Sequence, residues 1–352
     1  YFLFSCTFLH MSLLYYQMTD TATSQLVQLD ARIGVDVSKS QSLDDIITQA
    51  GFDFDVEKVP VYNPEGEEVN GQFIIRRADT RQNFAVMRKR YIPIPMKAML
   101  EPFYRMVEEF GGEIENAGLI QGGRKCWIAA NMNKDFGLRN REDDKMESRI
   151  MALMCNDGTK RDAYFAVNRR IFCNNQLSMM QKAASQSEFS VSHTKNWRDN
   201  LDRVRDNFHA ALQGYESFEK SANRLDELQI DPNEVRGFTH ELLPDPERKV
   251  PEGMKLEDLR TTSRLDNRRE KIVDLFTEGA GNRGLTRWDA FNALTEWVNH
   301  HNNINKLEKQ GHAAAERRFV NTLFGGTGHQ LMHRGMDLLL NTKKFKSIKP
   351  TL

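Results

Sequence analysis

A stripe of apolar side chains between residues 196 and 229 constrains the fold of this chain more than any other feature. Its members recur at alternating three- and four-residue steps, the heptad spacing of a helix with one apolar seam. They are Leu201, Val204, Phe208, Ala211, Tyr215, Phe218, Ala222 and Leu225. At 1.5 Å per residue, such a helix is about 50 Å long. It must bury the stripe against its own chain or against a second copy, and the sequence leaves both alternatives open.

Alternating apolar and polar residues before this helix predict an antiparallel sheet with one face in water. The predicted strands are Phe52–Tyr62, Phe73–Arg77, Phe84–Arg90, Glu113–Ile120, Arg124–Met132, Glu147–Cys155 and a segment that begins at Arg161. Turns rich in Gly and Asn are expected at Gln121–Gly123 and Asn156–Gly158. We interpret the polar stretch Asn133–Lys145 as a loop.

Helical patterns account for most of the remaining sequence. Met96–Phe110 predicts a helix with a kink or a later start at Pro102. Asp231–Pro251 contains four of the ten prolines and is interpreted as a linker. Thr286 and Asp289 have the spacing of a capping box, which predicts a helix that ends near His300.

The sequence therefore predicts an α+β protein: an antiparallel β-sheet with flanking helices, one long heptad-patterned helix and an α-helical C-terminal part. The expected parts are a leader at 1–17, a flexible segment at 18–41, an α+β core domain at 42–230, a Pro-rich linker at 231–254, a helical region at 255–342 and a basic tail at 343–352.

The apolar leader lacks Lys and Arg and is too short to span a bilayer. We interpret it as translated sequence upstream of an initiator at Met11 or Met18, with a membrane anchor as the alternative. The four cysteines form no C-x-x-C pair and are too few for a disulfide framework, so we expect reduced thiols in a cytoplasmic protein.

Several segments in this order resemble a family of phage- and plasmid-related proteins, the domain of unknown function 932. The segments are Ile33–Val37, Gly118–Arg124, Asn156–Gly158, Asn168–Leu177 and Thr286–His301. The resemblance covers about residues 33 to 340 and implies no established activity. The chain differs from the family at Arg88–Pro93, where members carry an amide- or aromatic-rich segment.

Local basic clusters with aromatic neighbours suggest a nucleic-acid surface. Lys+Arg and Asp+Glu are both 49, so the net charge alone excludes a strongly basic nucleic-acid-binding class and the argument rests on clusters. Cations release counterions from phosphates, and aromatic rings stack on unpaired bases. The candidate nucleic-acid-binding residues are Arg76, Arg81, Arg88, Arg90, Arg124, Lys125, Trp127, Arg169, Arg170 and Asn174. Since Arg169 and Arg170 are adjacent on a strand, only one of them can join a shared surface.

Three other chemistries have weaker signals. The histidines that could hold a metal are His300, His301, His312, His329 and His333, but no H-E-x-x-H pattern is present. Cys173 has no histidine nearby in the sequence to act as its base, so a buried strand cysteine is favoured over a nucleophile. Gly325–Gly328 lacks the phosphate-binding P-loop pattern and reads as an interhelical loop.

Our leading hypothesis is a non-enzymatic, cytoplasmic DNA-metabolism protein that binds single-stranded DNA as a recombination, annealing or replication accessory. The order of helix, hairpin, strand and long helix is loosely similar to that of the single-strand annealing recombinases, which form rings. We expect no cofactor and no bound metal, and a homo-oligomer through the 201–225 helix is a further hypothesis. The alternatives are a protein-interaction factor that acts on host machinery and an uncharacterised metal-dependent enzyme.

Overall fold

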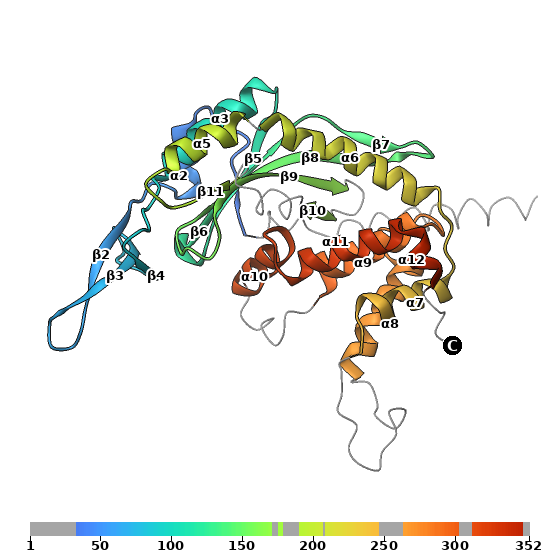
Figure 1. Ribbon diagram of the computed structural model, residues 1–352. Helices are drawn as coiled ribbons and strands as arrows, with labels where there is room; N and C mark the ends of the chain where they lie inside the picture. Colours follow the sequence, from blue (N-terminus) through green and yellow to red (C-terminus); the bar gives the residue numbers. More distant parts are fainter. Residues whose placement is uncertain are drawn as a thin grey trace, which may run out of the picture.

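The computed structural model of the chain describes residues 33–170, 175–178, 190–206, 208–245, 263–302 and 312–347. Within these ranges the chain forms one eight-stranded and one three-stranded antiparallel sheet, with helices on both sides of the larger sheet (Figure 1). The predicted α+β class is therefore confirmed. No helix of the described part is long and apolar enough to cross a membrane.

The larger sheet is a run of antiparallel neighbours, as the turn signals predict. Its order is β1-β5-β6-β8-β9-β10, with β7 paired to β8 and β11 paired to β9. The strands are β1 (Val35–Asp36), β5 (Glu113–Ile120), β6 (Lys125–Asn131), β7 (Phe136–Leu138), β8 (Arg141–Cys155), β9 (Asp162–Arg170), β10 (Gln176–Ser178) and β11 (Ser190–Val191). The short helix η2 (Gln121–Gly123) closes the β5–β6 hairpin, where Gly122 adopts a φ of 69°.

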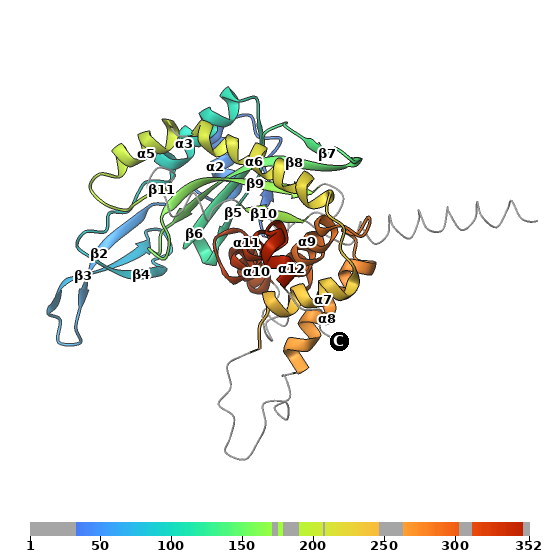
Figure 2. The ribbon, with the colours of Figure 1, turned by 45° about the vertical axis from the view of Figure 1, so that its right-hand side comes forward.

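Both faces of the larger sheet are covered, so the expectation of a face in water is wrong. Helices α2 (Leu43–Ala50), α3 (Met96–Glu109), α5 (Trp197–Asp206) and α6 (Phe208–Asp226) lie over one face (Figures 1 and 2). On the other face, Phe319 and Phe324 pack against Trp127 and Phe165 of the sheet. Every residue of β9 is buried as a result. Residues that alternate in sequence therefore meet two different cores rather than a core and solvent.

The heptad stripe is buried inside the single chain. Its described side chains, which are those of Leu201, Val204, Tyr215, Phe218, Ala222 and Leu225, are at most 8% exposed. Helices α5 and α6 carry them, and residue 207 between the two helices lies outside the described residues. Packing on the protein's own sheet thus uses the surface that a second copy would need.

A separate three-stranded sheet projects from one end of the body (Figure 1). It consists of β2 (Val56–Tyr62), β3 (Glu68–Arg77) and β4 (Asn83–Arg88) in sequence order. The link from β4 to α3 is held by His193, whose ring stacks on Tyr91 at a centroid distance of 4.6 Å. The same imidazole contacts the Ile92 carbonyl and the Asp162 carboxylate. This small sheet is therefore fixed to the end of β9 at which Asp162 lies.

The C-terminal part is helical, as predicted, and begins earlier than the sequence suggested. Its elements are α7 (Pro232–Leu242), α8 (Ser263–Glu278), α9 (Arg287–Glu296), η4 (Trp297–His301), α10 (His312–Leu323), α11 (Thr327–Leu340) and α12 (Thr342–Ser347). The linker interpretation of Asp231–Pro251 is wrong for α7, since Pro232 starts this helix and Asp231 caps it with Glu234 in a capping box. The capping box of Thr286 and Asp289 is confirmed.

Two other expectations need correction. Of the two alternatives at Pro102, the later helix start is wrong, because α3 runs through that residue, and the kink stays a prediction. The loop expected at Asn133–Lys145 instead contains β7 and the first part of β8, which begins at Arg141. Cys173 and Asn174, like the leader and most of the flexible N-terminal segment, lie outside the described residues.

Gly34 offers a test of the packing beneath β1. A Cβ atom added there would lie 2.6 Å from Cζ2 of Trp127 and 2.8 Å from the carbonyl oxygen of Ala117. Neither the buried ring nor the backbone can move away easily. We expect Gly34→Ala to lower the free energy of unfolding by about 1–3 kcal/mol, measured by urea unfolding. The neighbouring Val35 is 43% exposed, so Val35→Ala should change it by less than about 0.5 kcal/mol. Equal effects of the two substitutions would contradict this packing.

Candidate functional site

Four of the residues predicted to bind nucleic acid are buried and do not lie on a shared surface. Trp127 is fully buried against Phe319, with ring centroids 4.7 Å apart. Each of the three cations among them has a carboxylate partner. The ion pairs are Lys125–Asp157, Arg169–Glu147 and Arg170–Asp144. The prediction that these residues contact nucleic acid from a wet sheet face is therefore not compatible with their positions.

Five other predicted cations remain near the surface of the three-stranded sheet. Arg81, Arg88 and Arg90 are exposed, and so is Lys89 between the last two. Arg124 is half-buried, and its guanidinium donates to the Asn83 carbonyl at 3.2 Å. Arg76 differs, because it forms an ion pair of 2.6 Å with Glu57 on the adjacent strand.

We name the set Arg81, Arg88, Lys89, Arg90 and Arg124 the cationic sheet edge. Within the described residues, no carboxylate forms an ion pair with any of its members. Its turn residue Arg81 has a φ of 58°, which is unusual for a residue other than glycine. Phe84 and Tyr91 are the aromatic residues within this basic cluster of the sequence, but Phe84 is 3% exposed and Tyr91 stacks on His193, so neither ring forms an open stacking platform.

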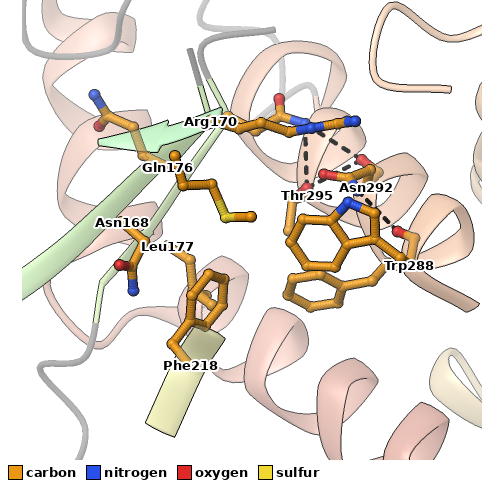
Figure 3. Close-up of a pocket in the computed structure, with 11 residues that line it drawn as sticks. Asn168, Arg170, Gln176, Leu177, Phe218, Trp288, Asn292 and Thr295 are labelled. Atoms are coloured by element: carbon orange, nitrogen blue, oxygen red, sulfur yellow. Dashed lines mark hydrogen bonds between the residues drawn. The ribbon is translucent and has the colours of Figure 1, made fainter. Parts of the chain in front are cut away.

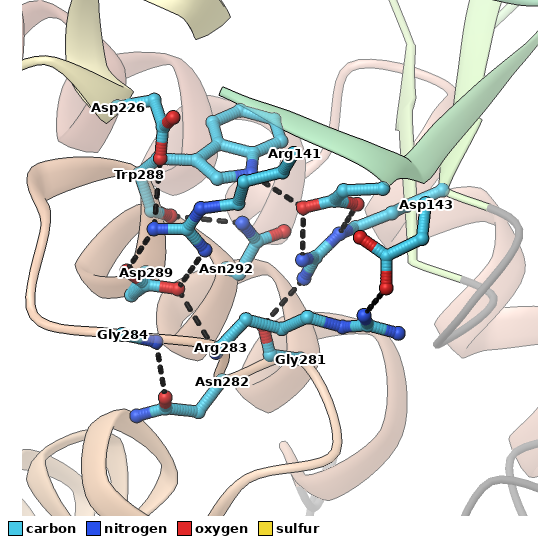
Figure 4. Close-up of polar contacts among 12 residues, drawn as sticks. Arg141, Asp143, Asp226, Gly281, Asn282, Arg283, Gly284, Trp288, Asp289 and Asn292 are labelled. Carbon is cyan, nitrogen blue, oxygen red and sulfur yellow. Dashed lines mark hydrogen bonds and ion pairs between the residues drawn. The ribbon is translucent and has the colours of Figure 1, made fainter. Parts of the chain in front are cut away.

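A network of buried ion pairs joins the larger sheet to α9, and we name it the polar clamp (Figure 4). Arg141 of β8 forms a two-bond pair with Asp289, with nitrogen–oxygen distances of 2.7 and 2.8 Å. The same guanidinium lies 2.8 Å from a carboxylate oxygen of Asp226 at the end of α6. Three elements far apart in the sequence therefore converge on one arginine.

The second half of the clamp is centred on Asp144. This carboxylate binds the guanidinium of Arg170 and accepts a hydrogen bond of 3.2 Å from the indole nitrogen of Trp288. Arg170 also donates to the Gly281 carbonyl in the loop before α9. Asp144 is fully buried, so its charge requires the Arg170 cation, and the indole N–H satisfies one of its oxygens further.

Two carboxylates of the α9 region have shifted pKa values. Burial alone would raise the pKa of Asp289, but hydrogen bonds from Arg141 and Thr286 and the charge of Arg141 outweigh it and lower that pKa. Burial alone would also raise the pKa of Glu296. There the contact with His301 and the backbone N–H groups of Gly281 and Ala280 prevail, and the pKa is lowered. Both groups are therefore ionised at neutral pH.

A small pocket lies beside the clamp, between β9, β10, α6 and α9 (Figure 3). Its apolar walls include Phe218, Trp288 and Phe291. Its polar lining includes Asn168, Arg170, Asn175, Asn292 and Thr295. The cavity has a volume of about 20 Å³ and its lining residues are at most 4% exposed, so it has room for one or two water-sized groups.

Two carboxamides of this pocket have polar atoms without hydrogen-bond partners. Asn168 is 2% exposed, and neither its amide nitrogen nor its amide oxygen has a partner in the chain. Asn175 donates to Thr295 at 3.2 Å, whereas its side-chain oxygen accepts no bond. Buried polar groups are almost always paired, so these atoms require an explanation.

Sequence reasoning did not identify the clamp or the pocket. It predicted the helix that is now α9 from its capping box alone, yet every residue of that helix is buried. The available signal was the set of polar residues between its aromatic ones, namely Asp289, Asn292, Thr295 and Glu296. Their partners lie on β8, at Asn175 just before β10 and in the loop before α9, and no local pattern indicates these contacts.

The weaker chemistries find little support in the described residues. No group of three or more His, Cys, Asp or Glu side chains in the described ranges is arranged to hold a metal ion. His329 packs against His333, and its pKa is lowered to about 3 by burial, His333 and Lys160. Cys126 and Cys155 are free and buried, and burial raises the pKa of both thiols. Gly325 and Gly326 lie between α10 and α11, and Thr327 and Gly328 begin α11.

The clamp predicts a loss of stability in acid. Asp289 and Glu296 have lowered pKa values when folded, so the unfolded chain binds more protons as the pH falls below the ordinary carboxyl range. We expect the Tm to fall steeply from about pH 5 downward. Asp289→Asn should lower the free energy of unfolding at pH 7 by about 3–5 kcal/mol and flatten this acid dependence. Thermal unfolding across a pH series measures both, and an unchanged acid slope in the variant would contradict the assignment.

Comparison with known proteins places the chain in a family without assigning it a reaction. No curated protein and no solved structure matches the chain. A family model described as "Domain of unknown function (DUF932)" matches residues 83–321, which is more than half of the chain. This range runs from β4 to α10 and includes both halves of the polar clamp and the pocket. The chain belongs to the domain of unknown function 932 family.

Proposed function

We propose that this chain is a non-enzymatic DNA-metabolism protein that binds single-stranded DNA through the cationic sheet edge. The supporting observation is the concentration of Arg81, Arg88, Lys89 and Arg90 at the two ends of β4, exposed and without carboxylate partners among the described residues. A role as a recombination, annealing or replication accessory in the cytoplasm of a phage or plasmid host is part of this proposal.

The spacing of these cations suits an extended chain of phosphates. Arg81 precedes β4 and Arg88 ends it. Six residues of strand separate the two groups by about 20 Å. A flexible single strand can follow such a line, and each neutralised phosphate releases counterions. Because Phe84 is buried and Tyr91 is stacked on His193, we expect binding that depends on charge and salt more than on base stacking.

A protein partner is the second candidate, favoured by the outer surface of the same three-stranded sheet. Tyr62 is 59% exposed and Val86 is 58% exposed, and these are among the few large apolar residues of the described part that face solvent. Apolar contacts are not screened by salt, whereas phosphate contacts are. The salt dependence of binding therefore separates the two candidates.

The cationic sheet edge predicts a defined salt dependence. Wild-type protein should bind a labelled single strand with an affinity that falls linearly with the logarithm of the salt concentration. Replacing Arg81, Arg88 and Arg90 by alanine should reduce that slope by about 2, since each phosphate contact with a single strand contributes about 0.7. Fluorescence anisotropy across a salt series measures the slope.

Lys343 supplies the matched control. It is exposed on α12, which lies far from the three-stranded sheet (Figure 1). Lys343→Ala should leave affinity and slope unchanged. An absence of binding at low ionic strength would show that the proposal is wrong, and so would equal losses in the triple variant and the control.

A further inference from the structure

The ring of His193 lies at the junction between the three-stranded sheet and the larger sheet. It belongs to the loop after β11, and its side chain is 5% exposed. Its Nδ1 lies 3.1 Å from the carbonyl oxygen of Ile92, and its Nε2 lies 3.0 Å from Oδ1 of Asp162. That carboxylate oxygen also accepts a hydrogen bond of 2.7 Å from the backbone N–H of Cys155. Both ring nitrogens therefore face oxygens that act as acceptors.

A neutral imidazole does not satisfy both of these contacts. It carries one N–H donor and one acceptor nitrogen, so in either tautomer one ring nitrogen would present its lone pair to an oxygen. The imidazolium carries two donors and satisfies the Ile92 carbonyl and the Asp162 carboxylate together. The geometry of the site therefore requires the charged form of His193.

This ring holds the segment between β4 and α3, residues 89–95, which we name the link. Tyr91 stacks on the imidazole with an interplanar angle of 5°. Ile92 makes two hydrogen bonds with His193, because its carbonyl faces the ring and its N–H donates to the His193 carbonyl at 3.0 Å. The link also carries Lys89 and Arg90 of the cationic sheet edge. One imidazole thus connects these residues to the start of β9.

Other titratable groups of the described residues near the ring keep their charge state around neutral pH. Burial alone would raise the pKa of Asp157, but hydrogen bonds from Lys125 and Thr159 and the charge of Lys125 lower it. Burial is the main cause that raises the pKa of the Tyr91 hydroxyl and of the Cys155 thiol. Asp157 therefore stays ionised, and the hydroxyl and the thiol stay neutral.

Lys58 of β2 is a second cation that holds the link. Its ammonium group donates to the carbonyl oxygens of Lys89 and Tyr91 at 2.7 and 2.8 Å. Burial and the charge of Lys89 lower its pKa. A test of His193 must therefore separate its titration from that of Lys58 at alkaline pH.

The pKa of His193 has the direction that the geometry requires. Burial alone would lower it, but the charge of Asp162 and the hydrogen bonds to Asp162 and Ile92 outweigh burial and raise it. A histidine with a raised pKa contributes stability that is fully present below its ordinary value of about 6.5. This contribution is lost as the pH rises through the folded-state value.

We propose that His193 is a pH-dependent latch, whose imidazolium fixes the link to the larger sheet and whose deprotonation at alkaline pH loosens it. Loss of the proton removes one of the two ring hydrogen bonds and the ion pair with Asp162. The proposal goes beyond strand binding, because the latch acts on the chain without a ligand. Every measurement below omits nucleic acid, so the latch and the proposed strand binding can fail separately.

The protonation state can be read directly in the wild-type protein. In protein with ¹⁵N-labelled histidine, one residue should show two protonated ring nitrogens, and its titration midpoint should lie above the ordinary value of about 6.5. The loss of its signals in His193→Gln assigns it. A midpoint at or below the ordinary value would overturn the proposal without any need for a folded variant.

Amide hydrogen exchange measures the hold on the link. Protection of the Ile92 N–H, taken relative to an unstructured chain at the same pH, should fall about tenfold between pH 6.5 and pH 8.5, the effect of losing one charge-assisted hydrogen bond. The N–H of Ala152, at the centre of β8, should change by less than about twofold. An equal fall at both amides would show that the proton stabilises the whole fold and would reject the latch.

His193→Gln tests the residue itself, because glutamine stays neutral at every pH. Its Ile92 protection should be about tenfold below wild type at pH 6.5 and equal to wild type at pH 8.5, and any remaining pH dependence belongs to Lys58. His240 is the matched control: it is half-buried on α7, and burial and Arg269 lower its pKa. His240→Gln should keep the wild-type profile. A full pH-dependent fall in His193→Gln, or no fall in wild type, would contradict the latch.

Discussion

The structure depends on the charge neutralisation of two arginines, Arg141 and Arg170, inside the contact between sheet and helices. Burying a guanidinium is unfavourable unless carboxylates and carbonyls replace its water shell. Here Asp289 and Asp144 do so with two bonds each, and Asp226 adds a single contact to Arg141. Hydrophobic packing alone would allow α9 to shift along the sheet. The ion pairs permit one position, because any other would leave buried charges without partners.

That fixed position explains why the pocket exists. The polar clamp holds α9 beside the ends of β8 and β9, and the side chains between them do not fill the space. A protein selected for stability alone would close such a gap with an apolar residue at position 168. The carboxamide found there is destabilising by itself, because its buried amide atoms have no hydrogen-bond partner.

Local sequence patterns predicted the elements whose contacts join residues close together in the sequence. The turn at Asn156–Gly158, the capping box of Thr286 and Asp289, and the hairpin of β5 and β6 all follow from residues within a few positions of one another. The start of β8 was missed because its charged residues read as a loop. Their charges are neutralised by α9, whose Asp289 lies 148 positions from Arg141, and no local pattern carries that information. The covering of the second face of the sheet was missed for the same reason, since the helix residues that cover it lie far from the strands in the sequence.

The distance along the chain between the two sides of the clamp has a consequence for synthesis. Residues 141 to 170 leave the ribosome more than a hundred residues before the loop and helix that complete their ion pairs. During that interval the sheet carries cations that are destined for burial and have no final partners, and α6 has no aromatic neighbour from α9. The N-terminal and C-terminal parts are therefore halves of one folding unit. We expect a nascent chain to need either rapid completion or a chaperone that tolerates exposed positive charge.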